Sequence, residues 1–307
     1  MKITLLDLIE QRKSIKESLR ARIEKVLDHG KFIMGPEILE LEKALSRITG
    51  SKHAYSSSSG TDSLLIALMA LGTKRNDAVF LPSFTWTSCA EVIALIRAKP
   101  VFVDVDKESY NISTDDLEKK ILMIRKSKKY KAKVIMAVDL YGLPANYRVL
   151  KTLSKKYKIN LLADAAQSFG AKTQDGNVGN LAEITTTSFF PSKPLGCYGD
   201  GGALFTNNSL LAKRINSIRL HGTEKNKHDV KRLGINGRMD TLQAAILLAK
   251  LSIFQKEIKL RNIVADQYDI FLSKNIITPK RFPGKRSAWA QYTIRVKRRR
   301  KLMEYLK

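Results

Sequence analysis

Residues 133–164 read KVIMAVDLYGLPANYRVLKTLSKKYKINLLAD and hold two short apolar runs with a helical pattern between them. The runs at 133–138 and 160–164 are continuously apolar, as in strands of a sheet that is covered on both faces. Between them, residues 146–157 place Leu150 and Leu153 at helical spacing. A strand, a helix and a second strand in this order are typical of an α/β sheet.

The same alternation extends in both directions, from residue 60 to about residue 206. Short apolar runs predict further strands at 78–82, 100–105, 185–190 and 203–206. Helical spacing predicts further helices at 61–72, 87–97 and 114–125. The sequence contains no internal repeat. We therefore expect an α/β fold of three layers, in which helices cover both faces of one sheet.

Helical patterns flank this region on both sides. Residues 3–28 and 36–48 precede it, and residues 239–272 follow it as one long helix or two in succession. Pro279 and Pro283 then mark a change of pattern.

The last part of the chain has a pattern of its own. Residues 290–296, AQYTIRV, are a candidate strand, and residues 299–307, RRKLMEYLK, begin an amphipathic helix. No further strand follows for that helix to pack against. We expect a large domain at residues 1–250 and an incomplete small domain of the α+β type at residues 251–307.

The composition is that of an ordinary folded protein. Of the 307 residues, 44% are hydrophobic and 27% are charged, which excludes wholesale disorder and a collagen-like chain. The formal net charge is +26, and a cationic surface favours nucleic acid. The basic residues are dense at 119–133, 151–158 and 297–301, but without an RNP-type aromatic motif or a zinc finger. We therefore favour a solvated basic surface and expect no nucleic-acid partner.

Cys89 and Cys197 are the two cysteines, and their spacing supports neither a zinc module nor a disulfide framework. The N-terminal segment lacks the apolar region and cleavage site of a signal peptide, and no apolar run reaches transmembrane length. We expect a cytoplasmic protein with no metal site and no membrane partner.

Two segments are candidates for binding charged groups. In SSSSGTD, residues 56–62, serines and Gly60 precede an apolar helix that begins near Thr61, and a helix N-terminus of this kind binds anions. The serines could instead serve only to cap the helix. In NLLADAAQSFG, Asp164 ends an apolar strand, where α/β sheets carry functional groups, although it could equally cap the next helix.

Lys193 lies in SFFPSKPLGCYGDGG, residues 188–202. Most lysines of so basic a chain are solvated, but Pro191 and Pro194 stiffen this loop, and the glycines behind it let the backbone approach a ligand closely. A lysine held in a partly dry pocket forms Schiff bases with carbonyl compounds. Trp86, which follows another strand, could cover a flat ring or pack in the core.

Together these features describe a site for pyridoxal 5′-phosphate (PLP). The helix start suits the phosphate, the lysine suits the aldehyde, and an aromatic side chain suits the ring face. A carboxylate keeps the pyridine nitrogen protonated, so that the ring can take up electrons.

The residues also resemble a known family, the DegT/DnrJ/EryC1/StrS aminotransferases. The resemblance runs from near residue 1 to about residue 296, and its most specific part is DAAQ followed at the right distance by SFFPSK and GDGG. It implies a PLP transferase of fold type I, with a mostly parallel mixed sheet, and a homodimer with shared active sites. Family members continue past the strand that resembles AQYTIRV, which is why we expect the small domain to be incomplete.

The resemblance also implies roles for individual residues. Lys193 would bear the cofactor and shuttle protons, and Asp164 would pair with the pyridine nitrogen. The remaining cofactor-binding residues would be those near the ring hydroxyl, on the ring face and around the phosphate: Gln167, Trp86, Gly60, Thr61, Ser188 and, from the neighbouring subunit, Asn236.

The implied reaction is transamination of a nucleotide-diphosphate keto-sugar with glutamate as amino donor. Relatives that dehydrate sugars carry histidine in place of the lysine, so Lys193 favours transamination. Two other functions stay open on the sequence: a PLP dehydratase of the same fold, and a non-catalytic remnant or regulator that lacks the C-terminal substrate-binding segment.

Overall fold

The computed structural model describes residues 6–306 except residues 225, 227 and 273–275. Its centre is a seven-stranded sheet in the order β1-β9-β8-β5-β4-β2-β3. Neighbouring strands are parallel except that β9 is antiparallel to both β1 and β8, which confirms the expected mostly parallel mixed sheet. The strands are β1 (His53–Ser57), β2 (Asp77–Pro82), β3 (Lys99–Val103), β4 (Lys131–Val138), β5 (Asn160–Asp164), β8 (Ile184–Ser188) and β9 (Gly202–Thr206).

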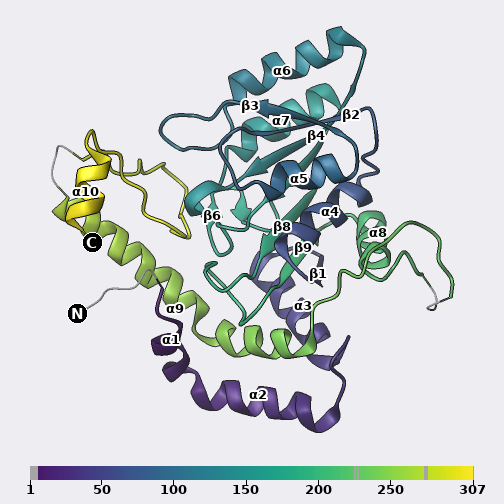
Figure 1. Cartoon of the computed structure of the whole chain (residues 1–307), viewed down its shortest axis with the longest axis vertical. Coiled ribbons are helices and arrows are strands. Elements are labelled where there is room, and N and C mark those ends of the chain that lie inside the picture. The colour runs from purple at the N-terminus through teal and green to yellow at the C-terminus, as the bar shows by residue number, and fades with distance from the viewer. Residues whose placement is uncertain (1–5, 225, 227, 273–275, 307) are drawn as a thin grey trace.

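Helices cover both faces of the sheet, as the sequence predicts (Figure 1). One face packs against α3 (Pro36–Thr49), α6 (Thr114–Ser127), α7 (Tyr147–Tyr157) and part of α9 (Thr241–Phe271). The other face packs against α4 (Gly60–Ala70), α5 (Ser88–Leu95) and α8 (Ser209–Arg219). Successive strand residues alternate between the two layers: Phe80 belongs to the first cluster and Val79 to the second. Both faces are therefore buried, which explains the continuous apolar runs.

The predicted single helix at the N-terminus is wrong, because two helices form. α1 (Leu8–Ser14) ends before Ile15, and α2 (Lys16–His29) begins after it. Ile15 leaves the helical conformation with φ −122°, and its side chain is buried with Leu19 against Ile246 and Ala249 of α9. Among its described residues α1 buries none, and it bonds to α9 through Gln11 and Glu257. The buried contacts with α9 come from Ile15 and Leu19, at and after the break. Predicted helix residues 3–5 lie outside the described part of the chain.

The predicted strand at 290–296 is also wrong. In this segment Arg295 forms one isolated bridge, to Ile277. The backbone near the start of this segment is hydrogen-bonded to a turn rather than to a strand. Ala288 N, just before the segment, donates to Gly142 O, and Gln291 N, within it, donates to Tyr141 O. That turn is the 3-10 helix η1 (Leu140–Gly142). The predicted C-terminal helix is present as α10 (Arg299–Tyr305), and Lys307 lies outside the described residues.

The remaining predicted helices and strands match those of the structure to within two residues at each end, and the pattern at 239–272 forms one helix, α9. Three further elements were not predicted from the sequence: β1, α8, and the two-stranded ribbon of β6 (Lys172–Thr173) and β7 (Gly176–Asn177). The predicted domain division at residue 250 falls inside α9, which runs from the sheet toward the C-terminal segment (Figure 1). That division stays a prediction.

Candidate functional site

The predicted residues gather at one edge of the sheet. β5 ends at Asp164 and β8 ends at Ser188, and these two strands are parallel neighbours. α4 begins at Gly60 and packs against β8. The carboxyl ends of the two strands and the N-terminus of the helix therefore meet, which is where α/β sheets place ligands.

The start of α4 forms a cradle against Ser188. A Cβ atom placed on Gly60 would lie 2.6 Å from Ser188 Cβ and 3.2 Å from Ser188 Cα. Ser59 caps the helix, because its Oγ accepts a hydrogen bond from Asp62 N at 3.0 Å and its carbonyl accepts one from Ser63 N. The N–H groups of Gly60 and Thr61 stand ahead of these bonds, at the positive end of the helix. With the exposed Thr61 side chain and Ser188 Oγ, they suit a phosphate.

Asp164 is a buried carboxylate with an exposed fraction of 7%. Its Oδ1 accepts a hydrogen bond from Ala166 N at 3.0 Å, and its Oδ2 accepts one from Cys89 Sγ at 3.3 Å. Burial raises the pKa of Asp164, while these two hydrogen bonds and the charge of Lys193 oppose the rise. A buried carboxylate of this kind is stabilised by a cationic donor, and a protonated pyridine nitrogen is one.

Lys193 lies in a loop that is closed on itself by backbone hydrogen bonds. Lys193 N donates to Phe190 O at 2.9 Å, and Cys197 N donates to Phe189 O at 2.8 Å. A Cβ atom on Gly196 would lie 2.5 Å from Pro191 O, so this position of the loop requires glycine. The buried Lys250 of α9 binds the same loop, since its Nζ donates to Gly196 O at 2.6 Å. The loop thus presents a half-buried Lys193 close enough to Asp164 to affect its pKa.

Trp86 and Gln167 border the same edge. Trp86 lies between β2 and α5 with 73% of its surface exposed, so it is not a core residue of this chain. Gln167 Oε1 accepts a hydrogen bond from Tyr141 N at 2.6 Å, which turns the amide so that its NH₂ group is the remaining donor. An aromatic face and an amide donor are what a hydroxylated ring would meet here.

Asn236 is exposed in the segment between α8 and α9. Ser58 N donates to Gly237 O at 3.1 Å, so this segment is fixed beside the residues that lead into α4. Asn236 also lines a shallow hollow together with Ile33 and Ser58. Its predicted contact with the phosphate of a neighbouring subunit stays a prediction, as do the other cofactor contacts.

The residues present fit PLP. The Gly60–Ser188 cradle has room for a phosphate because no Cβ fills it. Two groups donate hydrogen bonds to the Asp164 carboxylate, which leaves it able to pair with a cationic ring nitrogen. In the described part of the chain, no group of three His, Cys, Asp or Glu residues could hold a metal ion. Both cysteines are buried as free thiols.

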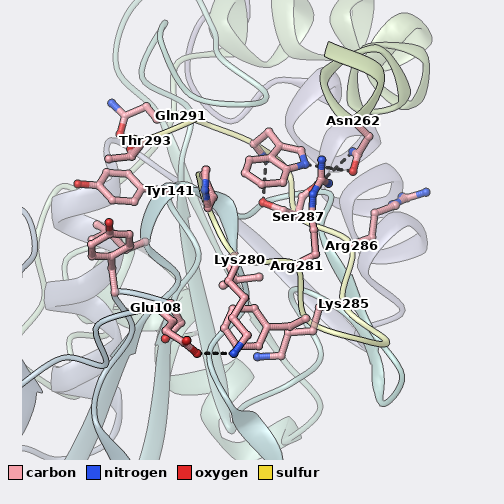
Figure 2. A pocket seen from close by; sticks show the side chains of 17 residues that line it. Glu108, Tyr141, Asn262, Lys280, Arg281, Lys285, Arg286, Ser287, Gln291 and Thr293 are labelled. Carbon is pink, nitrogen blue, oxygen red and sulfur yellow. Dashed lines mark hydrogen bonds and ion pairs between the residues drawn. The ribbon is translucent and has the colours of Figure 1, made fainter. Parts of the chain in front are cut away.

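A pocket that the sequence analysis missed opens beside Tyr141 (Figure 2). Its walls carry aromatic rings, among them Tyr110 and Tyr141, and cationic groups, among them Lys280, Arg281 and Lys285. Figure 2 shows Lys280 paired with Glu108 on one side and Tyr141 near Thr293 on another. Because Tyr141 N binds Gln167, this pocket adjoins the predicted cofactor residues.

The aromatic lining continues toward Trp86. Phe84 contacts the rings of both Tyr110 and Tyr141, with centroids 6.3 and 6.4 Å away, and it lies two residues before Trp86. The signal that could have revealed the pocket is weak, because its walls come from four separate parts of the chain: 108–110, 140–143, Asn262 of α9, and 279–293.

Known proteins resemble this chain along nearly its whole length. A model of the DegT/DnrJ/EryC1/StrS aminotransferase family matches residues 13–307. The UDP-2-acetamido-2-deoxy-3-oxo-D-glucuronate aminotransferase of Pseudomonas aeruginosa is 45% identical over 306 residues, which cover 99% of this chain and 83% of that protein.

Two solved structures are similar as well. A DegT DnrJ EryC1 StrS aminotransferase from Brucella abortus has a TM-score of 0.98 at 42% identity, covering 99% of this chain and 82% of that one. DesV of S. venezuelae, solved in complex with a ketimine intermediate, has a TM-score of 0.94 at 30% identity, covering 99% and 81%.

Proposed function

This chain belongs to the DegT/DnrJ/EryC1/StrS aminotransferase family, and we propose that it moves an amino group from glutamate to the keto group of a nucleotide-diphosphate sugar. As a member of that family it is an enzyme, a PLP-dependent aminotransferase. The observation that carries the proposal is the meeting of Asp164, Lys193 and the α4 N-terminus at one edge of the sheet.

PLP, when bound, supplies an aldehyde that takes up an amino group and a ring that accepts electrons. Lys193 Nζ would hold the aldehyde between turnovers and, once released, carry a proton to and from the reacting carbon. Asp164 would keep a proton on the ring nitrogen, and the Gln167 amide would donate to the ring hydroxyl. The cradle of Gly60, Thr61 and Ser188 would hold the phosphate and so fix the ring in place.

The pocket beside Tyr141 supports a nucleotide-linked substrate. Aromatic side chains such as Tyr110 and Trp289 suit a base, and lysine and arginine side chains suit a diphosphate. The 45% identical relative is named for a UDP-linked 3-oxo sugar, which agrees with a substrate of this class. We therefore place the sugar at the Lys193 side and the nucleotide toward this pocket.

We also propose a homodimer. Phe32, Ile33 and Met34 are exposed by 46%, 51% and 40%, and Ile33 lines the same hollow as Asn236. A second copy of the chain over this surface would bury the apolar side chains and bring Asn236 to a neighbouring site.

For the location of the protein we propose the cytoplasm, which agrees with two buried free thiols. None of the described helices is both long and apolar enough to cross a membrane.

The experiment that tests the function uses the PLP-loaded protein in two half-reactions. Glutamate alone should convert the cofactor to its amino form, which is seen as a loss of visible absorbance. A UDP-linked 3-keto sugar should then restore that absorbance and appear as an amino sugar by mass spectrometry, with a dTDP-linked 4-keto sugar as the comparison. If glutamate converts the cofactor but no nucleotide-linked keto sugar reverses the change, the proposed acceptor is wrong.

A further inference from the structure

Cys89 lies in the first turn of α5, and its thiol meets the one carboxylate that the site would use for the cofactor ring. Cys89 Sγ is 3.3 Å from Asp164 Oδ2, across 75 residues of sequence. Cys89 is fully buried and Asp164 is 7% exposed, so the hydrogen bond between them lies inside the protein. Burial, and next the charge of Asp164, raise the pKa of Cys89 well above its ordinary value. The group is therefore a thiol, and it donates.

The two hydrogen bonds of Asp164 come from different directions. Oδ1 is held by Ala166 N, in the turn that follows β5, and Oδ2 is held by Cys89, on the helix that follows β2. Bonds to both oxygens fix the rotation of the carboxylate about its Cβ–Cγ bond. When one of these bonds is removed, the oxygen that it held is free to swing away from the ring position.

Residues 85–89 connect this bond to the ring face. Thr85 Oγ1 lies 3.5 Å from Cys89 Sγ, and Cys89 N donates to Trp86 O at 3.3 Å. The short turn that presents Trp86 thus also presents the thiol to Asp164. One segment would set both the aromatic face and the carboxylate that meets the ring nitrogen.

We propose that Cys89 is a positioning residue for the cofactor, whose S–H group orients Asp164 toward the ring nitrogen of PLP. This inference rests on the proposed function. A thiol is a weaker donor than a hydroxyl, so it orients the carboxylate while leaving most of the negative charge on Oδ2. That charge is what keeps a proton on the pyridine nitrogen.

The proposal predicts a change that packing alone would not cause. A protonated ring nitrogen is a positive charge that lowers the pKa of the linkage between Lys193 and the cofactor. If Cys89→Ala lets Asp164 turn away, the ring loses its proton and the pKa of the linkage rises. The half-reaction with glutamate should slow by about 10- to 100-fold, the usual weight of a hydrogen bond to a charged group.

The experiment titrates the visible absorbance of the PLP-loaded protein against pH in a set of variants. Asp164→Asn removes the carboxylate and should show the largest rise in the linkage pKa. Cys89→Ala should shift the linkage pKa in the same direction. Cys89→Ser keeps a donor and should titrate closer to the wild type. Val92→Ala removes buried methyl groups from the same helix without a bond to Asp164, so it controls for packing and should leave the linkage pKa in place.

A double variant tests whether Cys89 acts through Asp164. Adding Cys89→Ala to Asp164→Asn should cause no further shift, because the thiol acts only through the carboxylate. If Cys89→Ala titrates like the wild type while Asp164→Asn shifts, the thiol is not a positioning residue and the proposal fails, although the proposed function survives. A wild-type protein that binds no PLP would instead overturn the proposed function itself.

Discussion

Replacing Gly60 by alanine should close the phosphate cradle. The new Cβ would lie 2.6 Å from Ser188 Cβ, about 1 Å closer than ordinary carbon contacts allow, and 3.2 Å from Ser188 Cα. Ser188 belongs to the buried strand β8, so the strain cannot be relieved by a flexible side chain alone. We expect a cost of about 1–3 kcal/mol from overpacking. A displaced phosphate would lose roughly one charge-assisted hydrogen bond, about 1.5–3 kcal/mol, which weakens PLP binding roughly 10- to 150-fold.

The assay is a PLP titration followed by absorbance, together with thermal unfolding of the unloaded protein. Gly179→Ala is the matched control, because its Cβ would lie 2.3 Å from Thr49 Cγ2, where none of the predicted cofactor residues lies. That variant should lose stability but bind PLP as the wild type does once folded. Unchanged PLP affinity in Gly60→Ala, with Ser188 in place, would refute the phosphate cradle.

Three further changes have defined outcomes. Asp164→Asn should leave PLP bound, through Lys193 and the phosphate contacts, but suppress transamination; near-normal turnover with glutamate would show that another group holds the ring proton. Burial lowers the pKa of Lys250 from 10.5 to about 8. Between pH 8 and pH 10.5 the unfolded chain therefore binds a proton that the folded chain does not. The free energy of unfolding should rise with pH over this range, by at most about 3 kcal/mol. Lys250→Met should abolish that rise in denaturant titrations at pH 8 and pH 10. Burial raises the pKa of Asp139 from 3.8 to about 6, so its contribution to stability is complete below about pH 4 and is lost, by about 3 kcal/mol, as the pH rises through 6. Denaturant titrations of Asp139→Asn at pH 4 and pH 7 should show this loss removed, and an unaltered difference between the two pH values would mean that Asp139 titrates normally.

The sequence predicted those strands whose buried side chains are apolar. β2, β4 and β5 are covered on both faces and appear as continuous apolar runs. β1 was missed because its burial is polar: Ser56 N and Oγ both donate to Glu42 Oε1, which also pairs with Arg219. No local pattern reveals that such a strand is buried, since its partners come from two helices elsewhere in the chain.

α8 was missed although its signals are local. Asn208 caps it through Leu210 N and Leu211 N, and Ile215 and Ile218 follow at helical spacing. The break at Ile15 and the missing strand at 290–296 are different cases, because each depends on what the segment packs against in the folded chain.

Within the site, the local motifs placed Asp164 and Lys193 at the edge where the structure has them. The contacts that orient them were beyond sequence reasoning. Cys89 reaches Asp164 only through the sheet, and Gln167 is turned by Tyr141, whose backbone has the rare φ of 58° in η1. The fold supplies these orientations.

The central claim is that Lys193 holds the cofactor, and borohydride reduction of the PLP-loaded protein tests it most directly. Reduction makes the linkage between the lysine and the cofactor permanent, and peptide mapping by mass spectrometry then finds the labelled residue. We predict a single pyridoxyl group on the peptide that contains Lys193, and none after Lys193→Ala. A label on any other of the lysines of this chain, or a coloured protein in which no lysine is labelled, would contradict the account.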